Sequence, residues 1–375
     1  MNEAQLTMKR LIAALILLAA VALLSACGGG ESAALIDSAA ETAEEVVDEA
    51  EAELEEETEV EPLDEAEEET EAEPEAEPDV EAEEAAPEVT TISHTLGETE
   101  IVGVPERVVA LEWTYVEDLL ALGIQPVGVA DIAGYETWVN VQPELADDVT
   151  DVGTRQEPNL EAIAALEPDL IIGVEFRHAP IYEDLSSIAP TIIFNPYPAE
   201  AGPDQFAEME ETFLTIAEAV QRQGEASEVL ADMEATFAEG YDQLEAAGLI
   251  GSEFVLAQAF SAEGGPQVRL FTDNSMAVQI FNRLGLENAW EGGFEQYGFS
   301  TVGIEALAEV QDANFLYVVQ SDDDVFANQA DNPVWNSLQF VQEDRTYPLG
   351  GDTWLFGGPL SAELVVEKTV DLLTE

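Results

Sequence analysis

Residues 151–172 have the sequence D-V-G-T-R-Q-E-P-N-L-E-A-I-A-A-L-E-P-D-L-I-I, which contains the clearest indication of the fold class. This pattern predicts a loop, then a short helix that Pro158 and Asn159 open, then a strand. The helix is indicated by apolar residues at helical spacing, which are Leu160, Ile163, Ala164 and Leu166. Pro168 ends the helix, and the unbroken apolar run at 170–172 is typical of a buried strand in a parallel sheet. The stretch therefore predicts an α/β fold.

The same stretch resembles a motif of the siderophore-binding lipoproteins of bacterial ABC importers, most closely the ferric-citrate and carboxylate-hydroxamate group. That motif is V-G-T-R-x-x-P-N/S-L-E-x-I-x-x-L-x-P-D-L-I-I. Upstream, P-E-R-V-V-A-L-E at 105–112 and G-I-Q-P-V-G-V-A at 123–130 are similar to the family's opening strand, helix and second strand. Downstream, Arg177-His178 and I-A-P-T at 188–191 are similar to two further segments. The likeness is strong over 92–197, moderate over 250–320 and loose near the C-terminus.

The resemblance implies a class III periplasmic binding protein fold. In this fold two lobes, each with a parallel-type sheet covered by helices, are joined by a single long helix. It also implies that the protein binds a ferric siderophore outside the cytoplasmic membrane and delivers it, as a monomer, to an ABC permease and its ATPase. Two alternatives stay open: a haem or cobalamin carrier of the same class, and an acidic surface scaffolding or adhesion lipoprotein without transport activity.

The N-terminus has the pattern of a lipoprotein signal peptide over residues 1–26. Lys9 and Arg10 precede an apolar run at 11–24, which is too short for a stable membrane span, and L-S-A-C follows at 24–27. Cys27, the only cysteine in the chain, resembles a lipobox cysteine that becomes the lipidated N-terminus. The protein is then extracytoplasmic and anchored to the membrane, at the cell surface or in the periplasm, with no intramolecular disulfide. A signal cysteine that is never modified is the alternative.

An acidic segment separates this anchor from the folded part. Residues 31–88 contain 28 Asp or Glu and no Lys or Arg, so we expect a disordered tether over 27–90. Weak calcium binding is the alternative. Residues 89–375 still carry 52 acidic and 8 basic residues, a net charge of about −44. Nucleic acid is therefore an unsuitable partner, because phosphate binding needs a basic face. The excess of acid fits either a saline habitat or a solubilising surface.

The part that follows is long enough for two lobes. We expect an N-terminal lobe at 91–223, a connecting helix at 224–247 and a C-terminal lobe at 248–375. The connecting helix has one apolar face, formed by Leu230, Met233, Phe237, Tyr241 and Leu244. An ordinary surface helix would show the same face, and the resemblance favours the connecting role.

In the C-terminal lobe, predicted strands and helices alternate as they do in the N-terminal lobe. Strands are predicted at 253–259, 315–319 and 345–349, and helices at 275–284 and 362–373. In addition, N-L-E-A-I at 159–163 is echoed by G-I-E-A-L at 303–307, and each precedes a buried strand. This pseudo-repeat predicts related lobes.

The residues favour binding over catalysis. The chain has no G-x-S-x-G or G-x-x-x-x-G-K motif, and its two histidines, His94 and His178, are too few for a His-rich metal site. We therefore expect no enzyme activity, no cofactor and no protein metal ligands, with iron arriving already chelated.

Arginines are the main candidates for ligand contact. Arg155 and Arg177 fall in loops where parallel strands should end, facing the space between the lobes. The family's matching arginines bind carboxylate or hydroxamate oxygens of the ferric complex, a task suited to a planar, permanently charged group. The alternative is a structural ion pair. His178 either contacts the ligand or positions its neighbour.

Aromatic side chains should supply flat walls for the chelator. By resemblance Trp113 and Trp354 fall at pocket positions, and Tyr197 follows a predicted strand; Trp290 and Tyr297 are weaker candidates. The citrate-type relatives have arginines two and four places after this tryptophan, whereas here Phe356 and Gly358 occupy those places. Arg269 is a candidate replacement, or a structural ion pair. The departure predicts a less anionic ligand, such as a hydroxamate or mixed-type ferric siderophore.

Two glutamates are predicted to contact the permease. Glu161 and Glu305 occupy equivalent places in the pseudo-repeat, in the first turns of helices in separate lobes. The family's matching glutamates pair with permease arginines. Solvated glutamates favoured by the helix dipole are the alternative.

Overall fold

The computed structural model describes residues 88–200, 204–262 and 265–375. The expected signal peptide, Cys27 and the tether up to residue 87 lie outside the described residues. Within the described ranges, no helix combines the length and apolar character that crossing a bilayer requires.

The first lobe is built on a five-stranded sheet in the order β5-β4-β3-β6-β7, in which every neighbouring pair is parallel. Its strands are β3 (Val108–Ala110), β4 (Gly128–Val129), β5 (Thr150–Asp151), β6 (Leu170–Val174) and β7 (Thr191–Phe194). All residues of β3, β6 and β7 are buried, which explains their continuous apolar sequence. The connecting helices are α3 (Trp113–Ala121), α4 (Ile132–Trp138), α5 (Leu160–Ala165), α6 (Glu175–His178), η1 (Ala179–Ile181) and α7 (Tyr182–Ile188).

The loop between β5 and α5 is constrained at both ends. Gly153 has a φ of 99° and forms an isolated bridge with Pro158. Its carbonyl accepts a 2.7 Å hydrogen bond from the backbone N–H of Asp131. At the other end the side chain of Asn159 caps α5 by accepting hydrogen bonds from two backbone N–H groups. The predicted loop, helix and strand are all confirmed, and Arg155 lies in the middle of the constrained loop.

The second lobe has a six-stranded sheet in the order β11-β9-β8-β12-β13, with β10 also paired to β8. Its strands are β8 (Glu253–Ala262), β9 (Gly265–Phe271), β10 (Glu287–Asn288), β11 (Phe299–Val302), β12 (Asn314–Val318) and β13 (Thr346–Pro348). The helices are α10 (Met276–Arg283), η2 (Ile304–Glu309), η3 (Ala327–Gln329), α11 (Pro333–Ser337), α12 (Gln339–Gln342) and α13 (Pro359–Thr374). The three predicted strands and two predicted helices are present.

This second sheet is mixed, whereas the sequence pattern predicted parallel pairing. β8, β10, β12 and β13 are parallel, but β9 pairs antiparallel with both β8 and β11. The reason is that β9 follows β8 as the second arm of a hairpin, which needs no crossover helix. The arrangement of β3, β6 and β7 in the first lobe nevertheless matches that of β8, β12 and β13 in the second. The two halves of the pseudo-repeat, α5 and η2, precede equivalent strands.

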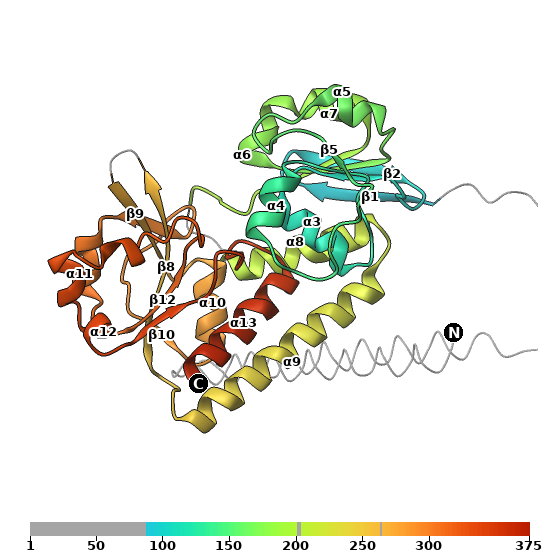
Figure 1. Cartoon of the computed structure of the whole chain (residues 1–375). Helices are drawn as coiled ribbons and strands as arrows, with labels where there is room; N and C mark the ends of the chain where they lie inside the picture. Colours follow the sequence, from blue (N-terminus) through green and yellow to red (C-terminus); the bar gives the residue numbers. More distant parts are fainter. Residues whose placement is uncertain (1–87, 201–203, 263–264) are drawn as a thin grey trace, which may run out of the picture. The chain divides into compact units, whose positions relative to one another are not determined.

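Two consecutive helices join the hydrophobic cores of the lobes. α9 (Gln223–Ala247) matches the helix predicted at 224–247; its Ala226 packs in the first core, and Met233 and Phe237 pack in the second. α8 (Gln205–Ala219) does the same in reverse, because Phe206 lies in the second core and Phe213 in the first. The last helix, α13, packs along α9 and also contacts α3 (Figure 1).

The N-terminal end of the described chain forms a hairpin that the sequence analysis did not predict. β1 (Val89–His94) pairs antiparallel with β2 (Gly97–Val102), and Gly97 adopts a φ of 138° at the turn. Ile92 and Ile101 insert into the first core, where both are buried. The hairpin begins at Val89, just inside the range expected for the tether.

Candidate functional site

Residues of both lobes and of α8 line a cavity of about 460 Å³, a size suited to a small ligand. The first lobe contributes Glu112, Thr114, Tyr115, Arg155, Val174, Phe176 and Arg177, and the segment after β7 adds Pro196 and Tyr197. α8 contributes Gln205, Glu208, Met209 and Thr212. The second lobe contributes Arg269, Met276, Tyr297, Phe299, Trp354, Phe356 and Gly357. The first-lobe residues follow the carboxyl ends of parallel strands, where open α/β sheets bind ligands.

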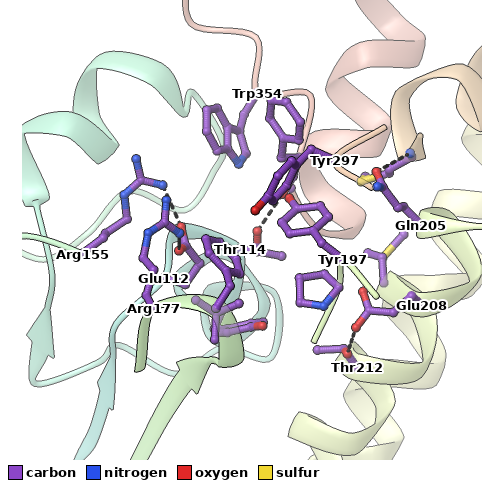
Figure 2. A pocket seen from close by; sticks show the side chains of 18 of the residues that line it. Glu112, Thr114, Arg155, Arg177, Tyr197, Gln205, Glu208, Thr212, Tyr297 and Trp354 are labelled. Carbon is purple, nitrogen blue, oxygen red and sulfur yellow. Dashed lines mark hydrogen bonds and ion pairs between the residues drawn. The ribbon is translucent and has the colours of Figure 1, made fainter. Parts of the chain in front are cut away.

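A carboxylate organises the two arginines of the first lobe. Oε1 of Glu112 lies 2.7 Å from Nη1 of Arg155, and Oε2 of the same carboxylate pairs with Nη1 of Arg177 (Figure 2). Glu112 is buried, and both arginine side chains are largely buried. Arg155 and Arg177 both line the cavity, as predicted, but Arg177 lies in the short helix α6 and not in a loop. The ion-pair alternative is also realised, because Glu112 pairs with both arginines and Oδ2 of Asp131 lies 3.8 Å from Nε of Arg155.

Arg155 lies flat against an aromatic wall. Its guanidinium carbon lies 3.3 Å from the ring centroid of Trp113 and 6.0 Å from that of Trp354. Trp113 itself is buried behind the arginine, and its indole N–H lies 3.2 Å from the carbonyl of Asp131. Trp113 was predicted to contact the ligand, but it does not line the cavity. It supports Arg155 instead, because the arginine covers its ring.

His178 lies behind the cavity wall and does not line the cavity, so it does not make the ligand contact that was one of its two predicted roles. The ring is buried: Nδ1 accepts a 2.9 Å hydrogen bond from the N–H of Val174, and Nε2 lies 2.9 Å from the carbonyl oxygen of Arg155. The first bond leaves the proton on Nε2, which then donates to Arg155. Burial lowers the pKa of His178, so the ring is held neutral. The residue ties the Arg155 loop to the end of β6, which is the positioning role that the sequence left open.

Arg269 reaches the cavity from β9 of the second lobe. Its Nη1 donates a 2.9 Å hydrogen bond to Oε1 of Gln258, and its guanidinium lies over the rings of Phe299 and Phe260, at 4.5 and 5.0 Å. Among the described residues no carboxylate lies within ion-pair distance of it. Burial lowers its pKa from the ordinary arginine value, which marks a desolvated cation. The structural ion pair considered for Arg269 is therefore not formed in the described chain.

Aromatic side chains from three segments meet at the cavity. Tyr197 contacts Phe176 of the first lobe and Tyr297 of the second, with ring centroids 5.6 and 5.4 Å apart. The rings of Phe176 and Tyr297 also meet directly, at 6.2 Å. Trp354 lines the cavity, as predicted, and its indole Nε1 has no hydrogen-bond partner among the described residues. The weaker candidate Trp290 does not line the cavity.

The two positions that depart from the citrate-type pattern have separate structural explanations. Phe356 lines the cavity and contacts Trp354, with ring centroids 5.3 Å apart. Gly358 precedes α13, and a Cβ atom there would overlap Oδ1 of Asp118. An arginine at 358 therefore has no room, and the cavity wall here is apolar.

One face of α8 forms the remaining polar wall. Gln205, Glu208, Met209 and Thr212 have helical spacing and all line the cavity, and Oε1 of Glu208 accepts a 2.8 Å hydrogen bond from Oγ1 of Thr212. Burial raises the pKa of Glu208 to about 7. Glu112 and Glu208 were both missed by the sequence analysis. Glu112 had a signal, because it ends the motif-like segment 105–112, whereas Glu208 is one of several similar glutamates in its helix.

The two predicted docking residues lie away from the cavity lining. Glu161 is exposed in the first turn of α5, and Glu305 is exposed in the first turn of η2. η2 is a 3₁₀ helix, not the α-helix that was expected. Among residues 88–200, 204–262 and 265–375, no group of three or more His, Cys, Asp or Glu side chains is arranged to hold a metal ion.

Comparison with known proteins places this architecture in a family. Residues 108–353, which include strands of both lobes and all three cavity arginines, match the family described as periplasmic binding protein. The chain belongs to the periplasmic binding protein family. The Fe(3+)-citrate-binding protein YfmC of Bacillus subtilis is 32% identical over 269 residues, which cover 71% of this chain and 80% of YfmC. The iron(3+)-hydroxamate-binding protein FhuD of Escherichia coli is 32% identical over 259 residues, covering 69% and 83%.

Solved structures of this periplasmic binding protein family agree with that assignment. The crystal structure of the Fe³⁺–Desferal-bound siderophore-binding protein FhuD from Vibrio cholerae superposes with a TM-score of 0.65 at 29% identity. The superposed region covers 72% of this chain and 98% of the Vibrio cholerae protein. The two-lobe fold predicted from residues 151–172 and their surroundings is thus confirmed at the level of the family.

Proposed function

We propose that the protein binds a ferric siderophore outside the cytoplasmic membrane and delivers it to an ABC permease and its ATPase. The relatives described above are named for binding ferric citrate, ferric hydroxamate or ferric Desferal. The observation that carries the proposal to this chain is the placement of its cations. In a domain with a net charge near −44, three of the eight basic residues surround one aromatic cavity.

The arginines are the groups proposed to hold the chelate oxygens. Arg155 and Arg177 lie on one wall and Arg269 on another, so a chelate in the cavity can be contacted from both lobes. Tyr197 and Trp354 are proposed to pack against the chelator arms. Hydrogen bonds from arginine to anionic oxygens are charge-assisted, which suits an iron centre wrapped in hydroxamate or carboxylate oxygens.

The charge balance of the cavity favours a ligand of low negative charge. Glu112 and Asp131 offset the charges of the two first-lobe arginines, and Phe356 and Gly358 stand where, by the resemblance, citrate-type relatives have arginines. A highly charged tricarboxylate complex would therefore meet too few cations. A ferric hydroxamate or mixed-type siderophore fits better, because three hydroxamates leave an iron centre without net charge.

We further propose that Cys27 is lipidated and that the acidic segment tethers the domain to the membrane. The basis is the L-S-A-C junction after a basic and apolar leader. Mass spectrometry of the membrane-extracted protein should find residues 1–26 removed and a diacylglycerol adduct on Cys27. An unmodified thiol or an intact leader would refute this part of the proposal.

A ligand panel tests the proposed function. Full-length protein is titrated with ferric citrate, a schizokinen-type chelate, ferric desferrioxamine and a ferric catecholate, and tryptophan fluorescence is recorded. Trp354 lines the cavity, so a bound iron chelate should quench its emission saturably. Haem and cobalamin are titrated in the same way. Quenching by one of them alone would favour a haem or cobalamin carrier. A response to no compound would favour a scaffolding protein.

A further inference from the structure

A second carboxylate, in addition to Glu112, lines the cavity. Glu208 lines the cavity from α8, and Figure 2 places it, with Thr212, on the side away from Arg155 and Arg177. Its hydrogen-bond partner is the hydroxyl of Thr212, at 2.8 Å. Within the described ranges no Lys, Arg or His lies within ion-pair distance of it.

An unpaired carboxylate in this position is costly. Transfer of a charged group from water into a partly dry pocket is unfavourable unless a counter-charge or several hydrogen bonds replace the water. All three cavity arginines lie elsewhere: Arg155 and Arg177 share Glu112, and Arg269 is held by Gln258. Charge is therefore distributed unevenly around the cavity: cations lie on two walls, and one carboxylate without a counter-charge lies on the third.

We propose that Glu208 recognises a protonated amine on the ferric chelate, so that the preferred ligand carries anionic oxygens at one end and an ammonium group at the other. This inference rests on the proposed function and narrows its substrate class. A carboxylate that receives an ammonium group regains the charge-assisted hydrogen bonds that burial removed. The same carboxylate would repel an anionic arm, so it also selects against chelates that are acidic at this end.

The neighbourhood of Glu208 makes the interaction dependent on pH. The titratable groups that act on or respond to it are Tyr115 and Asp118 of α3, Tyr197 after β7, and Glu211 of α8. Burial raises the pKa of both tyrosines, so their hydroxyls stay protonated at neutral pH, and burial also raises the pKa of Asp118. Glu208, with its pKa raised to about 7 by burial, is the group that ionises there, and only its ionised form attracts an ammonium group.

The test compares two probes that differ in one charge. Ferric desferrioxamine B carries a terminal ammonium, and its N-acetylated form does not; both keep the same iron centre. At pH 8 the full-length protein should bind the ammonium form about tenfold more tightly or better. The preference should shrink at pH 6. Glu208→Gln should reduce it to about twofold or less, mainly by weakening the ammonium form, whereas Glu218→Gln, exposed on the same helix, should leave it unchanged.

Each contrary result has a definite meaning. Equal binding of the two probes by the unmodified protein would overturn the inference, and this comparison does not depend on any variant folding. An ammonium preference that survives in Glu208→Gln would also overturn it. If neither probe binds but another ferric chelate quenches, the inference fails while the proposed function stands. Failure of every ferric chelate would refute the proposed function itself.

Discussion

Glu117 in α3 and Ser361 in α13 form a buried hydrogen bond, with Oε2 of the glutamate 2.6 Å from Oγ of the serine. The other oxygen of the same carboxylate accepts hydrogen bonds from the backbone N–H groups of Gly358 and Ser361, at 2.9 and 2.6 Å. A first-lobe side chain therefore caps the first turn of the last helix, which belongs to the second lobe. The contact holds the two lobes together beside the cavity.

This contact predicts that the domain loses stability as pH rises toward neutrality. Burial raises the pKa of Glu117 from 4.5 to about 7, so between these values the folded state holds a proton that the unfolded state releases. The stabilisation is complete below pH 4.5 and is lost as pH rises through 7, a change of about 3 kcal/mol. Urea unfolding of Glu117→Gln should show a flatter dependence between pH 5 and pH 8.

Glu136→Gln provides the control, because Glu136 is exposed on α4. Its unfolding should follow the pH dependence of the unmodified protein. If Glu117→Gln also keeps that dependence, the proton is not held at Glu117.

Glu112 should restrain the affinity for anionic chelates. Glu112→Gln leaves Arg155 and Arg177 side by side without their shared counter-charge, which should raise the affinity for ferric citrate by roughly tenfold. The same change should lower the free energy of unfolding by about 1–3 kcal/mol, because Arg177 loses its partner and Arg155 keeps only the more distant Asp131. Fluorescence titration and urea unfolding measure the two effects.

An exposed arginine ion pair supplies the comparison. Glu225 pairs with Arg222 at 3.2 Å on the surface of α9, and Glu225→Gln should change neither quantity measurably. Unaltered affinity in Glu112→Gln would show that its carboxylate does not compete with the ligand for the arginines.

Removal of the two exposed glutamates should separate delivery from binding. Glu161→Ala combined with Glu305→Ala should abolish uptake of the radiolabelled chelate while its affinity for the purified protein stays unchanged, because rim charges set association and register. Glu183→Ala with Glu309→Ala also removes one exposed glutamate from each lobe and should have little effect. Normal uptake at limiting chelate in the first double variant would exclude the docking role.

The local patterns predicted most of the fold, because they report on short segments. The helix begins after Asn159 and the strand at Leu170 for reasons present in the chain itself: a side-chain cap and a run of apolar residues. The hairpin at 89–102 escaped because its alternation is short and lies next to the acidic tether. The antiparallel pairing of β9 was not predicted, because the strand that opens a hairpin has the same sequence pattern as the strand that opens a crossover.

Site residues were predictable from the sequence only where they directly follow the strands of the parallel sheet. Arg155 and Arg177 follow β5 and β6, so the parallel sheet brings them together. Glu112 pairs with both arginines, but this pairing could not be predicted because it requires three separate segments of the chain to meet. Glu208 could not be selected from its helix, because Glu210 and Glu211 follow two and three places later and only packing shows which glutamate lines the cavity. His178 and Trp113 matched a motif, yet both support Arg155 from outside the cavity: His178 hydrogen-bonds to its backbone and Trp113 packs against its guanidinium.

Whether Arg155 and Arg177 hold the chelate is tested by titrating Arg155→Ala, Arg177→Ala and Arg222→Ala with the chelate that quenches best. Each of the first two variants leaves Glu112 with one arginine, so the fold should persist, and circular dichroism verifies this. The loss of one charged donor should weaken binding by about 1.5–3 kcal/mol, roughly ten- to a hundredfold, while Arg222→Ala binds normally. If Arg155→Ala and Arg177→Ala both bind as tightly as Arg222→Ala, the arginines are structural and the chelate does not bind in this cavity.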